Sequence, residues 1–137
     1  SFVHVVNAAG ICLFGYIAYP AQCVPDTLTA VTGTTYTMED CYKIGERIAT
    51  LRHAFNLREG LNPLDFYVNP RAIGEPPLTE GNVKGIKISE AHLVRQYLQA
   101  VGWDAKTARP SAAKLEELSL SFLAKDLAVP AAPPPAR

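Results

Sequence analysis

The sequence predicts an all-α fold, a multihelical single domain around one long central helix at about residues 38–59. Apolar residues between Thr37 and Gly60 recur at steps of three and four, which is the period of one helix face. No segment alternates strongly enough to name a strand. Residues 61–88, roughly, are rich in proline and glycine without a sustained period, so we expect a long irregular loop there.

The predicted long helix has clear start and stop signals. Thr37 is placed to cap its first turn, and Asp40 stands where the acid of a capping box belongs. Gly60 is the expected terminator. The predicted buried face consists of Cys41, Ile44, Gly45, Ile48, Leu51 and Phe55. At 1.5 Å per residue this helix is about 33 Å long, enough to cross a small domain.

The first residues, Phe2 to Tyr19, contain no formally charged side chain. A membrane span, a signal peptide and a helix buried on most sides are the three interpretations. The run is short for a span of about 20 apolar residues and includes His4, Asn7 and two glycines. A signal peptide has a basic start, which this segment lacks. We therefore expect a buried helix.

The remaining helices are predicted from their caps and apolar spacing. A short helix follows Pro25 from Asp26 to Thr32. After the long loop, Ser89 caps a helix that ends at Gly102, with Trp103 folding back as a core anchor. A last helix begins at Pro110 and Ser111, and its apolar positions are Leu115, Leu118, Leu120, Leu123 and Leu127. We expect a helical domain over residues 1–127 and a proline-rich tail over residues 128–137.

Charge and composition exclude several function classes. The 137 residues include 13 basic and 13 acidic side chains, so no net charge favours nucleic acid or an anionic membrane. Charged residues make up 19%, against about 25% in typical soluble domains. There are two interpretations of this low charged fraction. Some of the surface is normally covered by another protein part, or the value is ordinary variation in composition.

Cysteine and histidine usage argues against a disulfide framework and against a zinc site. The three cysteines are isolated from one another: Cys12, Cys23 and Cys41. An odd number without a close pair suits a reducing compartment, and we expect a cytoplasmic location. The histidines form no metal-ligand spacing with them: His4, His53 and His92.

No GxSxG, HExxH, GxxxxGK or GxGxxG motif is present. The most unusual local feature is Asn7 to Cys12, NAAGIC, where an amide, a glycine and a thiol lie inside an apolar run. By residue type alone, Cys12 is expected to be a small buried apolar side chain.

Several motifs in order resemble the C-terminal part of the aldehyde ferredoxin oxidoreductase family. They are NAAGIC at 7–12, TG at 32–33, GERIATLRHAFNLREG at 45–60, GWD at 102–104 and KLEELSL at 114–120. The similarity runs from about Asn7 to Leu120. Its strongest part is the 45–60 block. Three positions depart from the family pattern: Asn7 replaces an aspartate, Ala108 replaces a common glycine, and Ser119 interrupts the usual LGL.

The resemblance implies a tungsten or molybdenum ion held by two pterin dithiolenes beside a [4Fe-4S] cluster. Cys12 matches the end of the family's DxxGLC segment and would be the fourth cluster ligand, with the other three in an upstream CxxCxxxC. Asn7 and Ile11 match pterin contacts. Asn7 replaces the family's aspartate, so it keeps an acceptor oxygen but lacks the charge that strengthens a carboxylate's hold on pterin N–H groups.

The polar residues of the strongest motif allow two interpretations: Arg52, Asn56, Arg58 and Glu59 either line a substrate or pterin cleft, or tie the helix end to the following loop. We favour the structural interpretation, since Arg–Glu networks at helix ends are commonly architectural. Asp65 and Arg71 in the loop allow the same two interpretations.

The resemblance further implies that the chain is a fragment whose partners are the missing N-terminal and middle domains, ferredoxin or another electron carrier, and an aldehyde or related substrate. With at most one cluster ligand, the isolated chain is expected to hold no cofactor and to be inactive. A stand-alone helical interaction module that lost the chemistry is the alternative, and a membrane-anchored protein is a third.

Overall fold

The computed structural model describes residues 1–128, and within them it contains helices and no strand, which confirms the predicted all-α fold. The α-helices are α1 (Phe2–Ala8), α2 (Leu13–Ile17), α3 (Cys23–Thr32), α4 (Met38–Arg58), α5 (Glu90–Ala100), α6 (Ala112–Glu117) and α7 (Ala124–Ala128). Short 3-10 turns lie at η1 (Pro63–Asp65), η2 (Pro70–Ile73) and η3 (Ser121–Leu123). None of the helices within residues 1–128 combines the length and apolar character that a membrane span requires.

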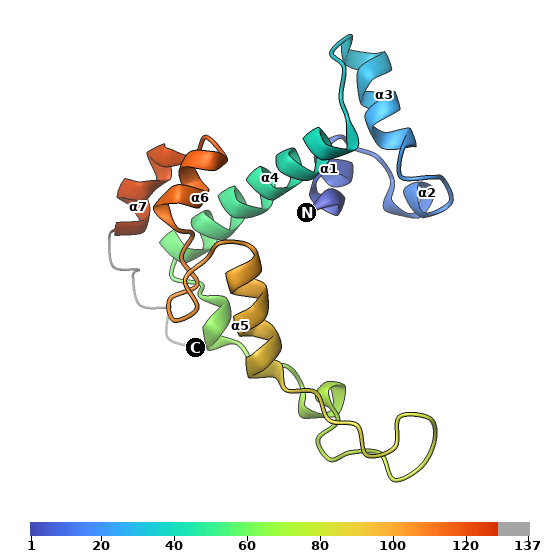
Figure 1. The fold of residues 1–137 in the computed structure, drawn as a ribbon, viewed down its shortest axis with the longest axis vertical. Coiled ribbons are helices and arrows are strands. Elements are labelled where there is room, and N and C mark those ends of the chain that lie inside the picture. The colour runs from blue at the N-terminus through green and yellow to red at the C-terminus, as the bar shows by residue number, and fades with distance from the viewer. Residues whose placement is uncertain (129–137) are drawn as a thin grey trace.

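The long helix α4 is the central element, as predicted. Figure 1 shows it crossing the molecule, with α1 beside its first half and α6 and α7 against its second half. The Thr37 side chain accepts a hydrogen bond from the Asp40 backbone N–H, and the Asp40 carboxylate accepts one from the Thr37 backbone N–H, so the capping box is complete. Gly60 ends the helix at φ 84°, a conformation that favours glycine.

The predicted buried face of α4 is correct in its first half and wrong in its second. Cys41 and Gly45 are buried, but Leu51 and Phe55 are 41% and 53% exposed. The buried residues of the second half are Thr50, Ala54 and Leu57. Different elements cover the two halves, and α6 to α7 approach from another side than α1. The buried face therefore shifts around the helix.

The core is divided into two clusters along α4. The N-terminal cluster comprises Phe2, Val5, Val6, Val24 and Cys41. The C-terminal cluster comprises Ala54, Leu57, Leu115, Leu118, Leu120, Leu123 and Leu127, so all five leucines predicted in the last segment are buried.

The expectation of one buried helix over Phe2 to Tyr19 is wrong. Gly10, at φ 70°, ends α1, and a second short helix starts after Cys12. Phe14 is 85% exposed and Tyr19 is 67% exposed. Of these two helices α1 packs on α4, whereas α2 packs on α1, with the Tyr16 ring 5.6 Å from the Phe2 ring.

The last segment also differs from the single helix expected. Ser119 adopts a left-handed conformation at φ 55°, which separates α6 from η3 and α7. The loop over 61–88 is irregular as predicted, apart from η1 and η2. Helix α3 begins at Cys23, three residues before the predicted start. Of the predicted tail, Ala128 ends α7, and residues 129–137 lie outside the described part.

The contact of α1 with α4 depends on Gly45, since a Cβ there would lie 2.7 Å from the Ser1 carbonyl carbon and 3.2 Å from Val5 Cγ2. We expect Gly45→Ala to lower the free energy of unfolding by about 1 kcal/mol or more, because overpacking of ~1–3 kcal/mol outweighs a helix-propensity gain of up to ~1 kcal/mol. Urea denaturation measures this. Gly15→Ala in α2 is the control, because its Cβ would meet only Cys12 Cβ at 3.8 Å. Equal stabilisation by both variants contradicts the packing described.

Candidate functional site

The turn between α1 and α2 brings together the residues proposed to hold cofactors. Cys12 is the N-cap of α2 and its side chain is exposed, which excludes its being a buried apolar residue. Asn7 is also exposed, whereas Ile11 packs partly against the N-terminal cluster. The turn is held by backbone bonds from Gly10 N–H to Asn7 O (3.2 Å) and from Ile11 N–H to Val6 O (3.0 Å). A thiol at this position is accessible to a group outside the chain.

Of the three cysteines, two are exposed and one is buried. Within residues 1–128, no group of three or more His, Cys, Asp or Glu side chains is arranged to hold a metal ion. Cys23 is exposed like Cys12, and Cys41 is buried. Burial raises the pKa of the Cys41 thiol, and the neighbouring Asp40 carboxylate adds to the rise. Cys41 is thus kept as a neutral thiol, which suits a core residue and not a metal ligand.

The 45–60 motif has a structural role, but through residues that sequence reasoning did not single out. Arg47 donates to the carbonyl oxygens of Leu118 and Ser119, the latter at 2.9 Å. Glu46 pairs with Lys114 at 2.9 Å, and Lys114 also pairs with Glu117 at 2.8 Å. The bonds of Arg47 and the Glu46–Lys114 pair join α4 to the C-terminal segment, whereas the Lys114–Glu117 pair lies within α6. The sequence contained one signal for this structural role: the charged residues Glu46 and Arg47 directly follow the motif glycine Gly45.

The predicted polar group is not brought together. Arg58 pairs with its neighbour Glu59 at 2.9 Å, both about half-exposed, and neither contacts the following loop through a side-chain bond within the described residues. The expected tie to the loop is therefore wrong for this pair. Arg52 and Asn56 are exposed. In the loop, Asp65 and Arg71 lie on the separate turns η1 and η2, and they form no common site.

A cavity of about 490 Å³ lies between α1, α4, η1 and α5. Its floor is an aromatic stack in which the His53 and Trp103 rings lie 3.8 Å apart at 5°, with Tyr97 edge-on to Trp103. Trp103 thus folds back onto α4 as predicted, but it is only partly buried and belongs to neither core cluster, so it is not the core anchor expected. His53 Nε2 is 2.7 Å from Ala108 O, so the neutral ring donates there. Two buried atoms in the lining, His4 Nδ1 and Trp103 Nε1, have no hydrogen-bond partner among residues 1–128.

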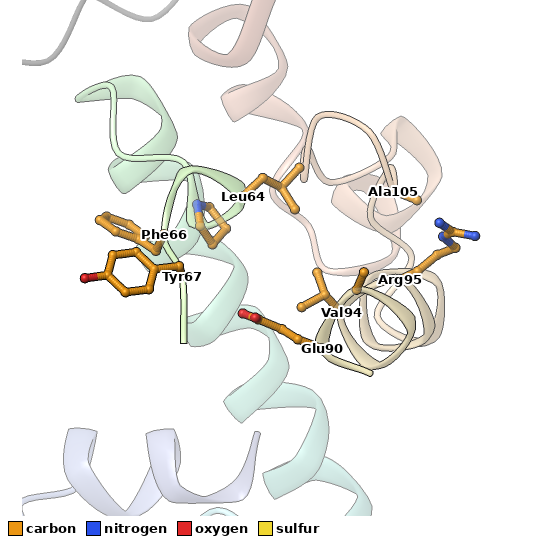
Figure 2. Close-up of a pocket in the computed structure, with 9 residues that line it drawn as sticks. Leu64, Phe66, Tyr67, Glu90, Val94, Arg95 and Ala105 are labelled. Atoms are coloured by element: carbon orange, nitrogen blue, oxygen red, sulfur yellow. The ribbon is translucent and has the colours of Figure 1, made fainter. Parts of the chain in front are cut away.

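A second cavity of about 360 Å³ adjoins the first along α5. Figure 2 shows Leu64 and Val94 in it, with Glu90 and Arg95 on α5 and the aromatic rings of Phe66 and Tyr67 beyond. The two cavities share Pro63, Leu64 and Val94. They therefore lie next to each other along α5, and we call the two together the α5 furrow.

Comparison with known proteins identifies the family. A family model described as "Aldehyde ferredoxin oxidoreductase, domains 2 & 3" matches residues 1–120. The chain belongs to the aldehyde ferredoxin oxidoreductase family. The resemblance seen in the motifs is confirmed, and the match covers the α1–α2 turn, α4, the α5 furrow and α6.

Curated relatives in this family are named tungsten-containing aldehyde ferredoxin oxidoreductase. The protein of Pyrococcus abyssi is 36% identical over 116 residues, which is 85% of this chain and 19% of that relative. The proteins of Pyrococcus furiosus and Thermococcus kodakarensis are 35% and 34% identical over 117 residues, with the same coverage. The chain thus spans about a fifth of the length of these relatives.

Two histidines next to the α5 furrow are expected to make the stability of this family member depend on pH. Burial lowers the pKa of His53 below 6.5, against the opposing effect of the Ala108 carbonyl, and burial with the Arg52 charge lowers that of His4. The unfolded chain therefore binds protons first as pH falls. The contribution of His4 and His53 to the free energy of unfolding is fully present above about pH 6.5. It is lost as the pH falls toward the pKa values of the two side chains in the folded protein.

We accordingly expect the free energy of unfolding to decrease from pH 7.5 to pH 5, a window above the range in which carboxylates titrate. Chemical denaturation at several pH values measures this. His53→Phe keeps an aromatic ring on Trp103 and removes one titrating group, so the decrease becomes smaller. The same change at the exposed His92 is the matched control. An unchanged pH dependence in His53→Phe contradicts the assignment.

Proposed function

We propose that this chain is the C-terminal helical part, residues 1–127 with a proline-rich tail at 128–137, of a tungsten-pterin, iron–sulfur oxidoreductase. The whole enzyme oxidises aldehydes to carboxylates with ferredoxin as electron acceptor, or carries out a related low-potential reaction. One observation carries the proposal: the family match over residues 1–120, with relatives whose names specify tungsten and of which the chain covers 19%. Tungsten is favoured over molybdenum for that reason.

Cys12 is the residue with a defined role in this proposal, as the fourth ligand of a [4Fe-4S] cluster. Its exposed position at the start of α2 supports the role, because a thiolate there can reach iron held mainly by another part of the protein. Such a cluster, when bound, supplies one-electron transfer out of the active site. Within this chain the Cys12 thiolate would hold iron, and the turn at Gly10, with φ 70°, precedes it and ends α1.

Asn7 and Ile11 are the proposed pterin contacts on the same turn. Asn7 is exposed and can present its amide oxygen to pterin N–H groups, although without the charge of a carboxylate. Ile11 is anchored in the N-terminal cluster, which orients the backbone next to Cys12. The turn thus contributes one cluster ligand and one wall of the pterin cleft.

The proposal requires partners outside the chain. The N-terminal and middle parts of the enzyme supply the remaining cluster cysteines and the rest of the pterin cradle, and ferredoxin or another carrier removes electrons. A cytoplasmic location fits the free cysteines Cys12 and Cys23. The chain alone provides one thiolate of four, so in isolation we expect it to be colourless and inactive.

The test is an activity measurement on the full-length gene product, purified without oxygen. The proposal predicts aldehyde-dependent reduction of ferredoxin or a viologen dye, and an upstream CxxCxxxC in the reading frame. The same assay on residues 1–137 alone gives no activity. A full-length protein with no activity on any aldehyde, and no such cysteines, contradicts the proposal.

A stand-alone helical interaction module is the second candidate. The replacement of the family's aspartate by Asn7, together with exposed apolar side chains such as Phe14 (85%) and Tyr97 (58%), favours it. A native start codon directly before Ser1 decides for this candidate, whereas an upstream family sequence decides for the enzyme.

A further inference from the structure

The direction of the Cys12 thiol depends on the backbone that carries it. Cys12 is exposed, and its side chain makes no capping hydrogen bond to α2 among residues 1–128. Gly15 leaves the surface beside it open, since a Cβ at that position would have only Cys12 Cβ within 4 Å among these residues, at 3.8 Å. No neighbouring side chain of α2 therefore holds the thiol, and its direction follows from the path of residues 11–16.

This backbone is anchored in the N-terminal cluster on both sides of Cys12. Ile11 precedes Cys12, packs against the cluster and donates its N–H to Val6 O at 3.0 Å. Tyr16 follows one helical turn later and packs against the same cluster. The Tyr16 N–H donates to Cys12 O at 2.8 Å, so a displacement of Tyr16 would also move Cys12.

The second of these anchors is an aromatic contact. The Tyr16 and Phe2 rings lie 5.6 Å apart at 41°, within the range of favourable aromatic pairs, and Phe2 is buried. Phe2 belongs to α1, which packs on the central helix α4. Within the described part of the chain, Tyr16 is the one side chain of α2 that packs against the N-terminal cluster, whereas Phe14 and Ile17 are exposed. The Tyr16 ring thus links α2 to the main body of the fold.

We propose that Tyr16 is a positioning residue for Cys12: its ring, held against Phe2, fixes the start of α2 and with it the direction of the thiolate. This rests on the proposed function, in which Cys12 binds a [4Fe-4S] cluster. Side chains that orient a metal ligand change the affinity and the electronic properties of the metal without touching it. The contact with Phe2 is made by the ring, so the Tyr16 hydroxyl is not required for this role.

Iron release from the full-length protein, purified without oxygen, tests the proposal. The rate is followed as the transfer of iron to an excess of a coloured iron(II) chelator. We expect Tyr16→Ala to release iron roughly 10- to 100-fold faster than the wild type, the usual cost in metal affinity of losing a residue that orients a ligand. Tyr16→Phe keeps the ring and should release iron at the wild-type rate.

Tyr42→Ala is the matched control. The Tyr42 ring contacts the same Phe2 ring, with centroids 5.3 Å apart, but Tyr42 belongs to α4 and not to the segment that carries Cys12. The substitution removes one aromatic contact of Phe2, as Tyr16→Ala does, and should leave the rate of iron release unchanged. Equal acceleration by the two alanine variants means a general loosening of the N-terminal cluster and overturns the proposal.

The electron paramagnetic resonance spectrum of the reduced cluster separates positioning from stability. A different direction of the Cys12 thiolate alters the g values of the folded protein, whereas a purely structural loss lowers the Tm and leaves the g values unchanged. We expect altered g values in Tyr16→Ala and in Tyr16→Leu, which keeps much of the apolar volume and provides the measurement if the alanine variant does not fold. Wild-type g values in the folded variants overturn the proposal.

The measurements on the wild type distinguish this inference from the proposed function. A folded full-length wild type that holds no cluster overturns the proposed function and the role of Tyr16 with it. A wild type that holds the cluster, with the same rate of iron release and the same g values in the Tyr16 variants, overturns the positioning role alone.

Discussion

Cys12→Ser in the full-length enzyme is expected to reduce aldehyde oxidation by at least roughly 100-fold, since even the loss of an outer partner of a metal ligand costs ~10–100-fold. The hydroxyl of serine is a poor substitute for a thiolate on iron. The exposed position of Cys12 at the start of α2 means that the substitution removes no core packing. Activity and iron content per polypeptide measure the effect, and helical circular dichroism should stay unchanged.

Cys23→Ser is the matched control. Cys23 is exposed and starts α3, and its thiol likewise makes no disulfide within the described residues. We expect wild-type iron content and activity. A Cys12→Ser enzyme that keeps its iron and its activity contradicts the role given to Cys12, and an equal loss in both variants means that the effect is not specific to ligation.

Leu120→Ala is expected to produce the largest loss of stability, about 2–5 kcal/mol, because removing a fully buried leucine costs its transfer free energy and leaves a cavity. Leu120 is 0% exposed and lies in the C-terminal cluster with Leu57 and Leu115. Its backbone N–H also donates to Leu115 O at 2.7 Å, so the chain around it is fixed and can collapse only partly. Urea denaturation measures the change.

Leu61→Ala provides a matched comparison, since Leu61 is 46% exposed and follows the end of α4. We expect it to cost less than about 1 kcal/mol. A Leu120→Ala loss as small as that of Leu61→Ala would show that the last leucines do not form a core with α4.

The sequence predicts elements whose causes are local. The long helix could be placed because Thr37, Asp40 and Gly60 act within one turn of its ends, and the structure shows all three in those roles. The leucines of the last segment were correctly assigned to the core for a similar reason. All five recur at helical spacing and are buried, although Ser119 divides the segment that carries them.

What could not be predicted depends on contacts between distant residues. The buried side of α4 turns from Gly45 toward Ala54 because two different elements cover its halves, and no local pattern encodes that change. Serine does not itself favour a left-handed conformation, so the break at Ser119 before η3 was missed, although the glycine of the family's LGL pattern at this position was a signal for it. The α5 furrow joins His4, His53 and Trp103, which are far apart in the sequence.

The candidate site was predictable only through family resemblance. Local chemistry assigned Cys12 to the interior, whereas the structure exposes it after the Gly10 turn. A single thiol carries no spacing pattern of its own, so its residue type alone cannot distinguish a proposed metal ligand from a core residue.

The metal content of the full-length protein tests most directly whether this helical part completes a tungsten and iron–sulfur enzyme. Elemental mass spectrometry on protein purified without oxygen should find about four iron atoms and one tungsten or molybdenum atom per polypeptide. The iron should be lost in Cys12→Ser and kept in Cys23→Ser. A folded full-length protein that contains neither iron nor tungsten nor molybdenum contradicts the proposed function.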